Sequence, residues 1–255
     1  MTQNFRHADI LQIARADGKV TVEHLANRFG VTLQTIRRDL SELSDQKKLE
    51  RVHGGAVIPS GTINIQYQER QKLNASAKEV IAQACADHIP DACSIFLNIG
   101  TSTEAVARQL ARRKNLVTVT NNMNVAQILG QNENCKTILT GGTLRGSDNG
   151  LVGTFARETI RQFKFDIAVI GCSAMDEDGD LLDFDEEEVA VSQTIIAQAR
   201  QCFLVADASK FNRTAPARIA SMQSLSKIFT DKPLPAKLAK RCDEWKTKII
   251  VAHQF

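Results

Sequence analysis

The apolar positions of the first sixty residues repeat with the period of amphipathic helices. Three such segments follow one another, at residues 6–17, 21–29 and 33–46. Thr21 and Thr32 stand at the N-cap positions of the second and third segments, and a glycine-containing turn separates the two. We therefore predict three short helices, the last two joined by a tight turn.

The third segment has one narrow apolar stripe and an opposite polar face. The stripe consists of Leu33, Ile36, Leu40 and Leu43, and the polar face of Gln34, Thr35, Arg38 and Ser41, with Arg37 at its edge. Two helices around a glycine turn, the second with exposed donor side chains, are typical of a helix-turn-helix. Its second helix reads the major groove of DNA. The next stretch, KKLERVHGGAVIP, predicts two short strands with Gly54-Gly55 at the tip, as in a β-wing.

The rest of the chain alternates apolar runs with helical segments. We expect helices at about 76–88, 103–113, 123–131, 155–163 and 188–200, and strands at CSIFLNI, LVTVTNN, KTILTGG, DIAVIG, QCFLVAD, KIFTD and TKIIVA. Continuous apolar strands separated by helices favour a parallel sheet covered on both faces. The predicted fold class is α/β, with an N-terminal winged helix-turn-helix and a larger, doubly wound, mostly parallel domain.

The two domains are separated by a polar stretch that begins with Pro59, Ser60 and Gly61. We assign 1–58 to the winged helix-turn-helix, 59–75 to a linker and 76–255 to an α/β effector domain. Alternatively, 64–73 is a helix of the second domain, which shifts only the border.

Polar residues gather where the predicted strands end. The clusters are Gly100-Thr101-Ser102-Thr103, Thr120-Asn121-Asn122, Gly141-Gly142 with Arg145, Gly171-Cys172-Ser173, and Asp207-Ala208-Ser209-Lys210. Ligands of parallel α/β sheets bind at the carboxyl ends of the strands, so these clusters predict a concave site for a small anion. Thr101, Ser102 and Thr103 are expected to bond phosphate oxygens at a helix N-terminus, and Lys210 or Arg145 to supply positive charge.

The segment DEDGDLLDFDEEE, residues 176–188, holds nine acidic residues and no basic one. A calcium-binding loop fits poorly, because the glycine stands at the fourth position rather than the sixth. Asp183 and Asp185 lie among apolar neighbours, which favours carboxylates that contact a specific partner over carboxylates that face solvent. They either bond sugar hydroxyls or act as bases.

Composition limits the remaining classes. Residues 1–60 carry nine Lys/Arg against seven Asp/Glu, and the remainder 23 against 22, so DNA binding is indicated by the motif and not by charge. No apolar run suits a secretory signal or a membrane span, and we expect a cytoplasmic protein without a membrane partner. The six cysteines and five histidines do not cluster. Buried thiols are therefore expected, with no metal and no cofactor.

The N-terminal motifs also carry a family resemblance. Arg6-His-x-x-Ile10, followed by VTVEHLANRFGVTLQTIRRDLSELSDQKKLERVHGGAV, resembles the DNA-binding domain of DeoR-family bacterial repressors; TIRRDL and HGGA are its specific parts. The phrases NIGTSTEAVA, VTNNMNVA, ILTGGTLRGSDNGLVG, DGDLLDFDEEEV and DASKF extend the likeness over nearly the whole chain. The resemblance implies DNA contacts by Thr32, Gln34, Thr35, Arg37, Arg38, His53 and Gly54. Arg and Gln suit base edges, whereas Thr32 and the wing suit phosphates.

The strand–GTST–helix element and the DASK element resemble ribose-5-phosphate isomerase A, which implies a sugar-phosphate isomerase-like effector domain. The chain lacks the Lys-Gly-Gly-Gly loop of that enzyme. The family likeness implies a homodimeric or homotetrameric repressor of a carbon-catabolic operon. The repressor would leave double-stranded operator DNA when it binds a phosphorylated sugar or polyol. The effectors that the likeness implies are glycerol 3-phosphate and a pentose phosphate. The alternatives are an isomerase-like enzyme with a DNA-binding domain, or an activator with the same ligand.

The predicted effector site combines the polar strand ends with the acidic segment. Asn121, Asn122, Asp183 and Asp185 are expected to distinguish hydroxyl groups. The full set is Gly100, Thr101, Ser102, Thr103, Asn121, Asn122, Gly142, Arg145, Asp183, Asp185 and Lys210.

Overall fold

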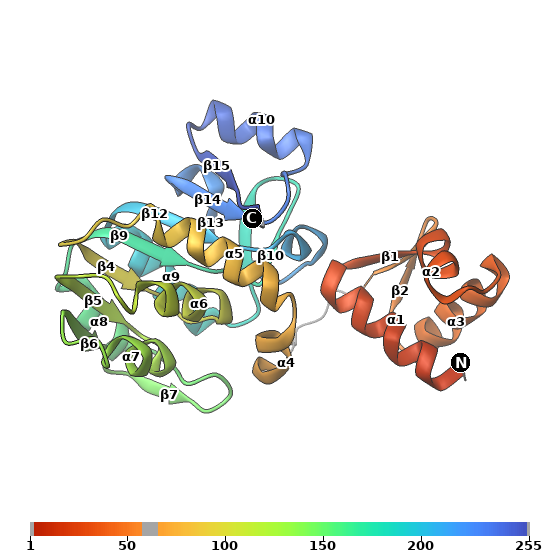
Figure 1. Ribbon diagram of the computed structural model, residues 1–255, viewed down its shortest axis with the longest axis horizontal. Coiled ribbons are helices and arrows are strands. Elements are labelled where there is room, and N and C mark those ends of the chain that lie inside the picture. The colour runs from red at the N-terminus through yellow and green to blue at the C-terminus, as the bar shows by residue number, and fades with distance from the viewer. Residues whose placement is uncertain (1–2, 58–65, 254–255) are drawn as a thin grey trace.

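The computed structural model describes residues 3–57 and 66–253, which form a small N-terminal unit and a larger α/β unit (Figure 1). The elements of the small unit are α1 (Gln3–Asp17), β1 (Lys19–Thr21), α2 (Val22–Phe29), α3 (Leu33–Asp45), β2 (Glu50–Val52) and β3 (Gly55–Val57). Its core is formed by apolar side chains from all three helices and from the strands. The predicted winged helix-turn-helix is confirmed.

The signals at the helix ends work as predicted. The Thr21 hydroxyl accepts a hydrogen bond from the backbone N–H of His24, and the Thr32 hydroxyl accepts one from that of Thr35. Gly30 ends α2 with φ of 64°, a left-handed conformation that glycine adopts without strain. Its N–H donates to the Ala26 carbonyl oxygen, which closes the last turn of α2.

The wing contains one strand that the sequence did not predict. Strand β1 pairs antiparallel with β3, giving the order β1-β3-β2. Gly55 allows this approach: a Cβ atom added there would lie 1.9 Å from the Val20 carbonyl oxygen. The glycine at the wing tip is therefore required by the close contact of two backbones.

The larger unit is built on seven parallel strands in the order β15-β14-β12-β9-β4-β5-β6. These strands are β4 (Ser94–Leu97), β5 (Leu116–Thr120), β6 (Cys135–Leu139), β9 (Phe165–Ile170), β12 (Ala199–Val205), β14 (Lys227–Thr230) and β15 (Lys248–Val251). The helices are α4 (Tyr67–Lys72), α5 (Ala75–Ala86), α6 (Thr101–Leu110), α7 (Met123–Leu129), α8 (Thr154–Arg161), α9 (Glu186–Gln198) and α10 (Ala236–Glu244).

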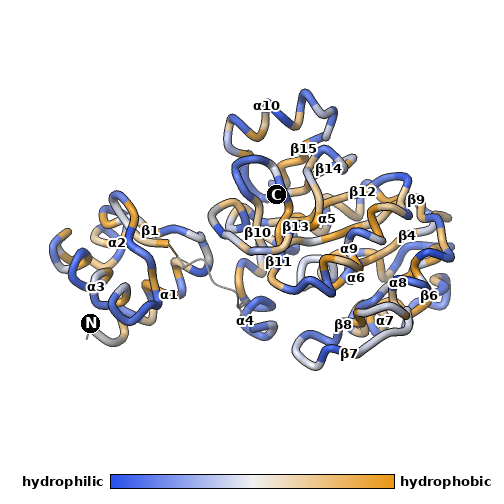
Figure 2. The backbone as a smooth tube through the Cα atoms, turned by 180° about the vertical axis from the view of Figure 1, so that it is seen from behind, coloured by the Kyte–Doolittle hydropathy of each residue, from blue (hydrophilic) through white to orange (hydrophobic). Residues whose placement is uncertain are grey.

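Successive residues of the central strands pack into two different cores. Ile95 and Leu97 belong to the layer with α5, α6 and α7, whereas Phe96 belongs to the layer with α8, α9 and α10. Figure 2 shows the hydrophobic positions gathered along the central strands and hydrophilic ones along the outer loops. A parallel sheet buried on both faces reads as a continuous apolar run, which is why the pattern predicted it.

Smaller elements of the larger unit escaped prediction. They are the hairpin β7 (Thr143–Arg145) and β8 (Gly150–Val152), the antiparallel sheet of β10 (Ala174–Met175), β11 (Asp180–Asp183) and β13 (Ala217–Ser221), and the 3₁₀ turns η1 (Ala208–Asn212) and η2 (Met222–Ser224). Residues 58–65 of the predicted linker lie outside the described residues. Residues 67–72 of that linker form α4. Over 3–57 and 66–253, no helix is long and apolar enough to cross a membrane.

Candidate functional site

Helix α3 buries one stripe and exposes the opposite face. Ile36, Leu40 and Leu43 are fully buried, as predicted. Leu33, which belongs to the same apolar stripe, is 45% exposed. Leu33 is the first residue of α3 and thus lies at the end of the helix that carries the exposed polar side chains.

The residues predicted to approach DNA form one surface of α3. A shallow depression there is lined by Thr32, Gln34, Thr35, Arg37, Arg38 and Ser41. The Arg38 side chain is 70% exposed, and its ion pair with Glu42 at 3.3 Å spans one helical turn. Such exposed pairs are weak, so the guanidinium can exchange Glu42 for a phosphate or a base edge.

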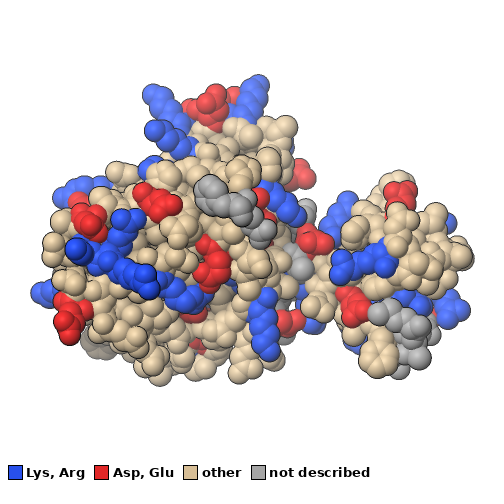
Figure 3. Space-filling view, viewed as in Figure 1, with Lys and Arg blue, Asp and Glu red and all other residues tan. Residues whose placement is uncertain are grey.

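The wing is tied to this helix. Arg51 on β2 donates hydrogen bonds to the Arg37 carbonyl oxygen (3.0 Å) and to the Ser41 hydroxyl (3.2 Å). His53 and Gly54 are exposed at the turn between β2 and β3. On the face shown in Figure 3, Lys and Arg are interspersed with Asp and Glu on both units, apart from one band of Lys and Arg that crosses the larger unit.

A buried ion pair fixes α3 against α1. Arg6 Nε lies 2.5 Å and Arg6 Nη2 3.0 Å from the two carboxylate oxygens of Asp39, and His7 Nε2 is 3.2 Å from one of them. Burial raises the pKa of the Asp39 carboxyl, but the bonds from Arg6 and His7 outweigh it and hold that pKa below its ordinary value. The aspartate of the TIRRDL motif thus orients the recognition helix and does not face DNA.

The polar ends of three neighbouring strands form a pocket in the larger unit. These strands are β4, β9 and β12, which lie side by side at the centre of the sheet. The pocket is lined by Arg70, Ile99, Gly100, Thr101, Ser102, Thr103, Gly171, Cys172, Ser173, Asp183, Glu188, Val205 and Lys210. Six of the predicted effector residues therefore come together: Gly100, Thr101, Ser102, Thr103, Asp183 and Lys210.

The GTST turn opens helix α6. Gly100 precedes the helix with φ of 141°, and the first N–H groups of a helix have no partner within it. Thr101 and Ser102 are half-buried, whereas Thr103 is fully buried. The Thr103 hydroxyl lies 2.7 Å from the carbonyl oxygens of both Asn98 and Gly100, and these two acceptors share its single proton. Its backbone N–H, rather than its hydroxyl, suits an anion.

Positive side chains are crowded next to this turn. Lys210 stands on η1, and Lys78 on α5 is buried and donates to the carbonyl oxygens of Arg70 and Leu73. Burial and then repulsion from Lys210 lower the pKa of Lys78 to about 8. Burial also lowers the pKa of Lys210, although Asp207 opposes that effect. A bound anion would relieve this repulsion, so the arrangement favours anion binding.

Two carboxyl groups line the opposite wall. Asp183 is 4% exposed and accepts a hydrogen bond from the Phe184 N–H at 2.7 Å, and burial raises the pKa of its carboxyl. Burial and then the charge of Asp183 raise the pKa of Glu188 to about 7, against the effect of Arg145 at 2.6 Å. These two carboxyl groups can accept hydrogen bonds from the hydroxyls of a ligand whose anionic end lies near Arg70 and Lys210.

The raised pKa of Glu188 predicts a pH dependence. The folded protein holds the Glu188 proton more tightly than the unfolded chain, so this group's contribution to stability falls as pH rises from about 4.5 to about 7. The carboxylate formed on this rise repels an anion in the same pocket. We expect Glu188→Gln to bind a phosphorylated ligand more tightly than the wild type at pH 8, by about 1 kcal/mol, and equally at pH 6.

Isothermal titration at both pH values measures this difference. Comparison at each pH removes the titration of the ligand's own phosphate, which affects both proteins alike. The exposed Glu133→Gln, on the loop before β6, serves as the control. Equal affinities of Glu188→Gln and wild type at pH 8 would contradict the expectation.

The other five predicted effector residues do not line the pocket. Asn122 caps α7 and donates to Glu104, and Asn121 donates to the Leu151 carbonyl oxygen. Asp185 caps α9, and Arg145 is engaged by Asp148, Asp185 and Glu188. Gly142 has φ of 129° and packs closely on the Val152 carbonyl oxygen. Helix capping and ion pairing thus engage the side chains of Asn122, Asp185 and Arg145.

Sequence reasoning missed Arg70 and Glu188. Arg70 lies in the segment assigned to the linker, and only the tertiary fold brings α4 to the strand ends. Glu188 was read as part of an acidic run. Asp185 followed by Glu188 three residues later is a capping-box pattern, which signals that a helix begins there and sets Glu188 in its first turn.

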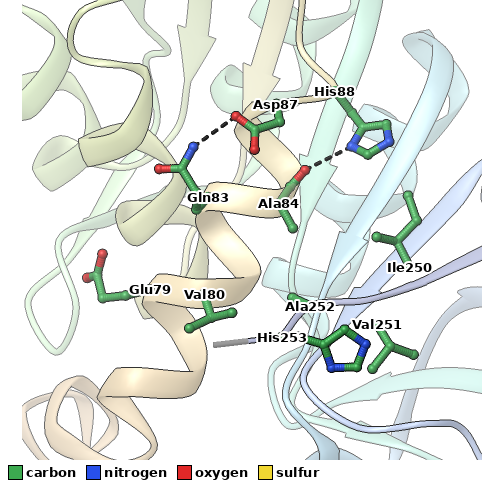
Figure 4. Close-up of a pocket in the computed structure, with 10 residues that line it drawn as sticks. All are labelled: Glu79, Val80, Gln83, Ala84, Asp87, His88, Ile250, Val251, Ala252 and His253. Atoms are coloured by element: carbon green, nitrogen blue, oxygen red, sulfur yellow. Dashed lines mark hydrogen bonds between the residues drawn. The ribbon is translucent and has the colours of Figure 1, made fainter. Parts of the chain in front are cut away.

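A larger and more apolar pocket lies elsewhere, between α5 and β15 (Figure 4). Its cavity of about 500 Å³ is lined by Glu79, Val80, Gln83, Ala84, Asp87, His88, Ile250, Val251, Ala252 and His253. None of its lining residues in the described part of the chain is Lys or Arg, and its two carboxylates, Glu79 and Asp87, repel an anion. The smaller polar pocket at the strand ends is therefore the candidate for an anionic ligand.

Comparison with known proteins agrees with this division. A profile described as the DeoR-like helix-turn-helix domain matches residues 6–62, and one described as the DeoR C terminal sensor domain matches residues 73–232. The chain is 41% identical over 238 residues to the glycerol-3-phosphate regulon repressor of Escherichia coli (strain K12), covering 93% of this chain and 94% of that protein. It is 40% identical over 253 residues to the protein of the same name from Haemophilus influenzae, covering 99% and 98%.

Among solved structures, a D-ribose-5-phosphate isomerase in complex with phospho-erythronic acid is similar with a TM-score of 0.41 and 15% identity, covering 54% of each chain. The sensor profile alone matches well over half of this chain, and both curated relatives align over nearly its whole length. The chain belongs to the DeoR family of transcriptional regulators.

Proposed function

We propose that the chain represses a carbon-catabolic operon and leaves its operator when a small phosphorylated polyol or sugar binds to the pocket at the strand ends. One observation carries this proposal: Lys210 and Arg70 line one pocket together with the first turn of α6 and with the carboxyl groups of Asp183 and Glu188. Cations and helix N–H groups suit a phosphate. The carboxyls suit hydroxyl groups on the same small ligand.

Glycerol 3-phosphate is the first effector to test, and a pentose phosphate the second. Two relatives that align with nearly the whole chain are named for the glycerol-3-phosphate regulon. The exposed face of α3 supports operator binding through Gln34, Arg37 and Arg38. Helix-turn-helix proteins bind two half-sites as dimers, so the proposed active form is a homodimer or a homotetramer.

The test measures DNA binding and effector binding separately. A DNA duplex selected by the wild-type protein from a random pool serves as operator, and glycerol 3-phosphate, ribose 5-phosphate and unphosphorylated glycerol are titrated against the complex. One phosphorylated compound is expected to weaken DNA binding at least tenfold, and glycerol to have no effect. If neither phosphorylated compound changes DNA binding or thermal unfolding of the free protein, this proposed function is wrong.

Arg38→Ala separates the two activities. Loss of a bidentate base or phosphate contact is expected to weaken DNA binding by about 1–3 kcal/mol, or about 5- to 150-fold, in each protomer. Effector affinity should not change, because α3 does not contribute to the pocket. Arg161→Ala is the matched control, since Arg161 is another exposed arginine in a local helical ion pair. Equal losses in both variants would contradict the role of Arg38.

One observation favours a second candidate, a sugar-phosphate isomerase-like enzyme. Glu188 lines the pocket and its pKa is near neutrality, as a general base requires. Against this, both the Glu188 carboxylate and the neighbouring Asp185 carboxylate are bonded to Arg145. Incubating the protein with ribose 5-phosphate and assaying for ribulose 5-phosphate decides the matter: product formation favours the enzyme.

A further inference from the structure

The two cations of the pocket stand on two elements of the larger unit that contact the DNA-binding unit. Arg70 is carried by α4, and Lys210 by the turn η1. Helix α1 packs next to η1, and Arg15 near the end of α1 forms an ion pair with Glu69 of α4. Figure 1 shows α4 on the side of the larger unit that faces α1. A ligand bound by these cations would thus contact both of the elements, α4 and η1, that make these contacts with α1.

Helix α4 is held by polar contacts rather than by a core. No α4 residue is buried among those described, and the Tyr67 hydroxyl donates to Glu104 (2.8 Å) while accepting from Asn124 (2.8 Å). Arg70 Nη2 is 3.3 Å from Asp148, and Arg70 Nε is buried without a hydrogen-bond partner among the described residues. A guanidinium with an unused donor next to the pocket is available to an incoming oxygen. A six-residue helix without buried apolar side chains costs little to move.

Helix α1 is firmly joined to the recognition helix. Its Arg6 forms the buried ion pair with Asp39 of α3, and its Ile10, Ile13 and Ala14 belong to the core of the small unit. A shift of α1 relative to α4 therefore moves α3 with it. In a dimer, such a shift alters the spacing of the two recognition helices, on which binding to two half-sites depends.

We propose that α4 couples the two units: Arg70 binds the phosphate of the effector, and the resulting shift of α4 changes the contact between Glu69 and Arg15 and so the placement of α1. This inference rests on the proposed function. It assigns roles to residues next to one another in the chain, Glu69 facing α1 and Arg70 facing the pocket. Coupling of this kind is reciprocal, so DNA must weaken effector binding by the same factor.

The experiment uses the full chain and glycerol 3-phosphate as the probe, with ribose 5-phosphate as the second probe. Three affinities are measured for each variant: for the probe alone, for the selected DNA alone, and for the DNA at saturating probe. Glu69→Arg is expected to leave the first two within twofold of wild type. It should reduce the effect of the probe on DNA binding by about fivefold, the scale of an exposed ion pair turned into a repulsion.

The exchange Arg15→Glu with Glu69→Arg restores the ion pair in the opposite direction and is expected to restore the coupling. Glu158→Arg, which makes the same charge change in an exposed helical ion pair far from α1, should couple like the wild type. Arg70→Lys keeps the charge but loses the fork of donors, and is expected to bind the probe about tenfold more weakly.

The outcomes are distinguishable. If wild type binds a probe and releases DNA, but Glu69→Arg couples as strongly as wild type, the role of α4 is overturned and the proposed function stands. Unchanged probe affinity in Arg70→Lys overturns the assignment of Arg70. If neither probe binds the wild type, the proposed function fails, and this inference with it.

Discussion

Replacing Asp39 with alanine is expected to destabilise the winged unit by about 3 kcal/mol, because it leaves the Arg6 guanidinium buried without its carboxylate. Arg6 and Asp39 have side chains only 9% and 1% exposed, so water cannot compensate for the lost partner. Since the pair orients α3 on α1, DNA binding should be lost at temperatures where the wild type binds. Pocket occupancy by glycerol 3-phosphate should not change.

Chemical denaturation followed by circular dichroism measures the loss, and Asp45→Ala on the exposed end of the same helix is the control. The lowered pKa of Asp39 also sets a direction with pH. The pair's contribution is complete above the ordinary pKa of an aspartate and is lost as pH falls through the lower pKa of the folded state. Equal stability of Asp39→Ala and Asp45→Ala would show that the buried pair does not hold α3.

Replacing Lys210 with methionine is expected to weaken binding of the phosphorylated effector by about 1.5–3 kcal/mol, or roughly 10- to 150-fold. Two effects on the stability of the ligand-free protein oppose each other, because removal of Lys210 relieves its repulsion of Lys78 but also removes its attraction for the buried Asp207 carboxylate. The wild type gains about 2.7 kcal/mol at a ligand concentration of 100 Kd. At the same concentration, the variant should gain only about 0.3–1.4 kcal/mol.

Thermal unfolding with and without glycerol 3-phosphate measures both quantities on one sample. Lys136→Met, at an exposed position on the edge strand β6, is the control for loss of a positive charge. A variant that loses stability without ligand but keeps the full ligand-induced gain would contradict the role given to Lys210. Thr103→Ala is a poorer test, because its hydroxyl bonds the backbone and its loss disturbs the turn.

Elements with a complete local signal were predictable from the sequence. Helix α2 has an apolar stripe, a capping threonine and a terminating glycine, and each signal works in the structure as expected. The seven parallel strands follow from apolar runs whose alternate residues enter two cores. Elements of two or three residues, such as β10 and β1, carry too short a pattern to show a period, and only their antiparallel partners define them.

The pocket was predictable at the strand ends and unpredictable on its other side. Thr101 and Lys210 directly follow apolar strands in the sequence, so topology alone places them at one edge of the sheet. Arg70 reaches the pocket from a short helix that has no buried face. For Asn122 and Asp185 the residue type predicted a polar contact but not which one, since the same side chains serve equally as ligands of an effector and as helix caps. Both side chains cap helices in the structure.

The strand order of the central sheet has a consequence for folding during synthesis. Strand β4 pairs with β9, so Ile95 can pair only after the chain has been synthesised as far as Ile167. Strand β9 pairs in turn with β12. The buried core of the winged unit is formed by residues between Ile10 and Ala56. Contacts distant in sequence form slowly, and domains fold in order as the chain emerges from the ribosome. Each new chain therefore completes its DNA-binding unit before its sensor can respond to any ligand.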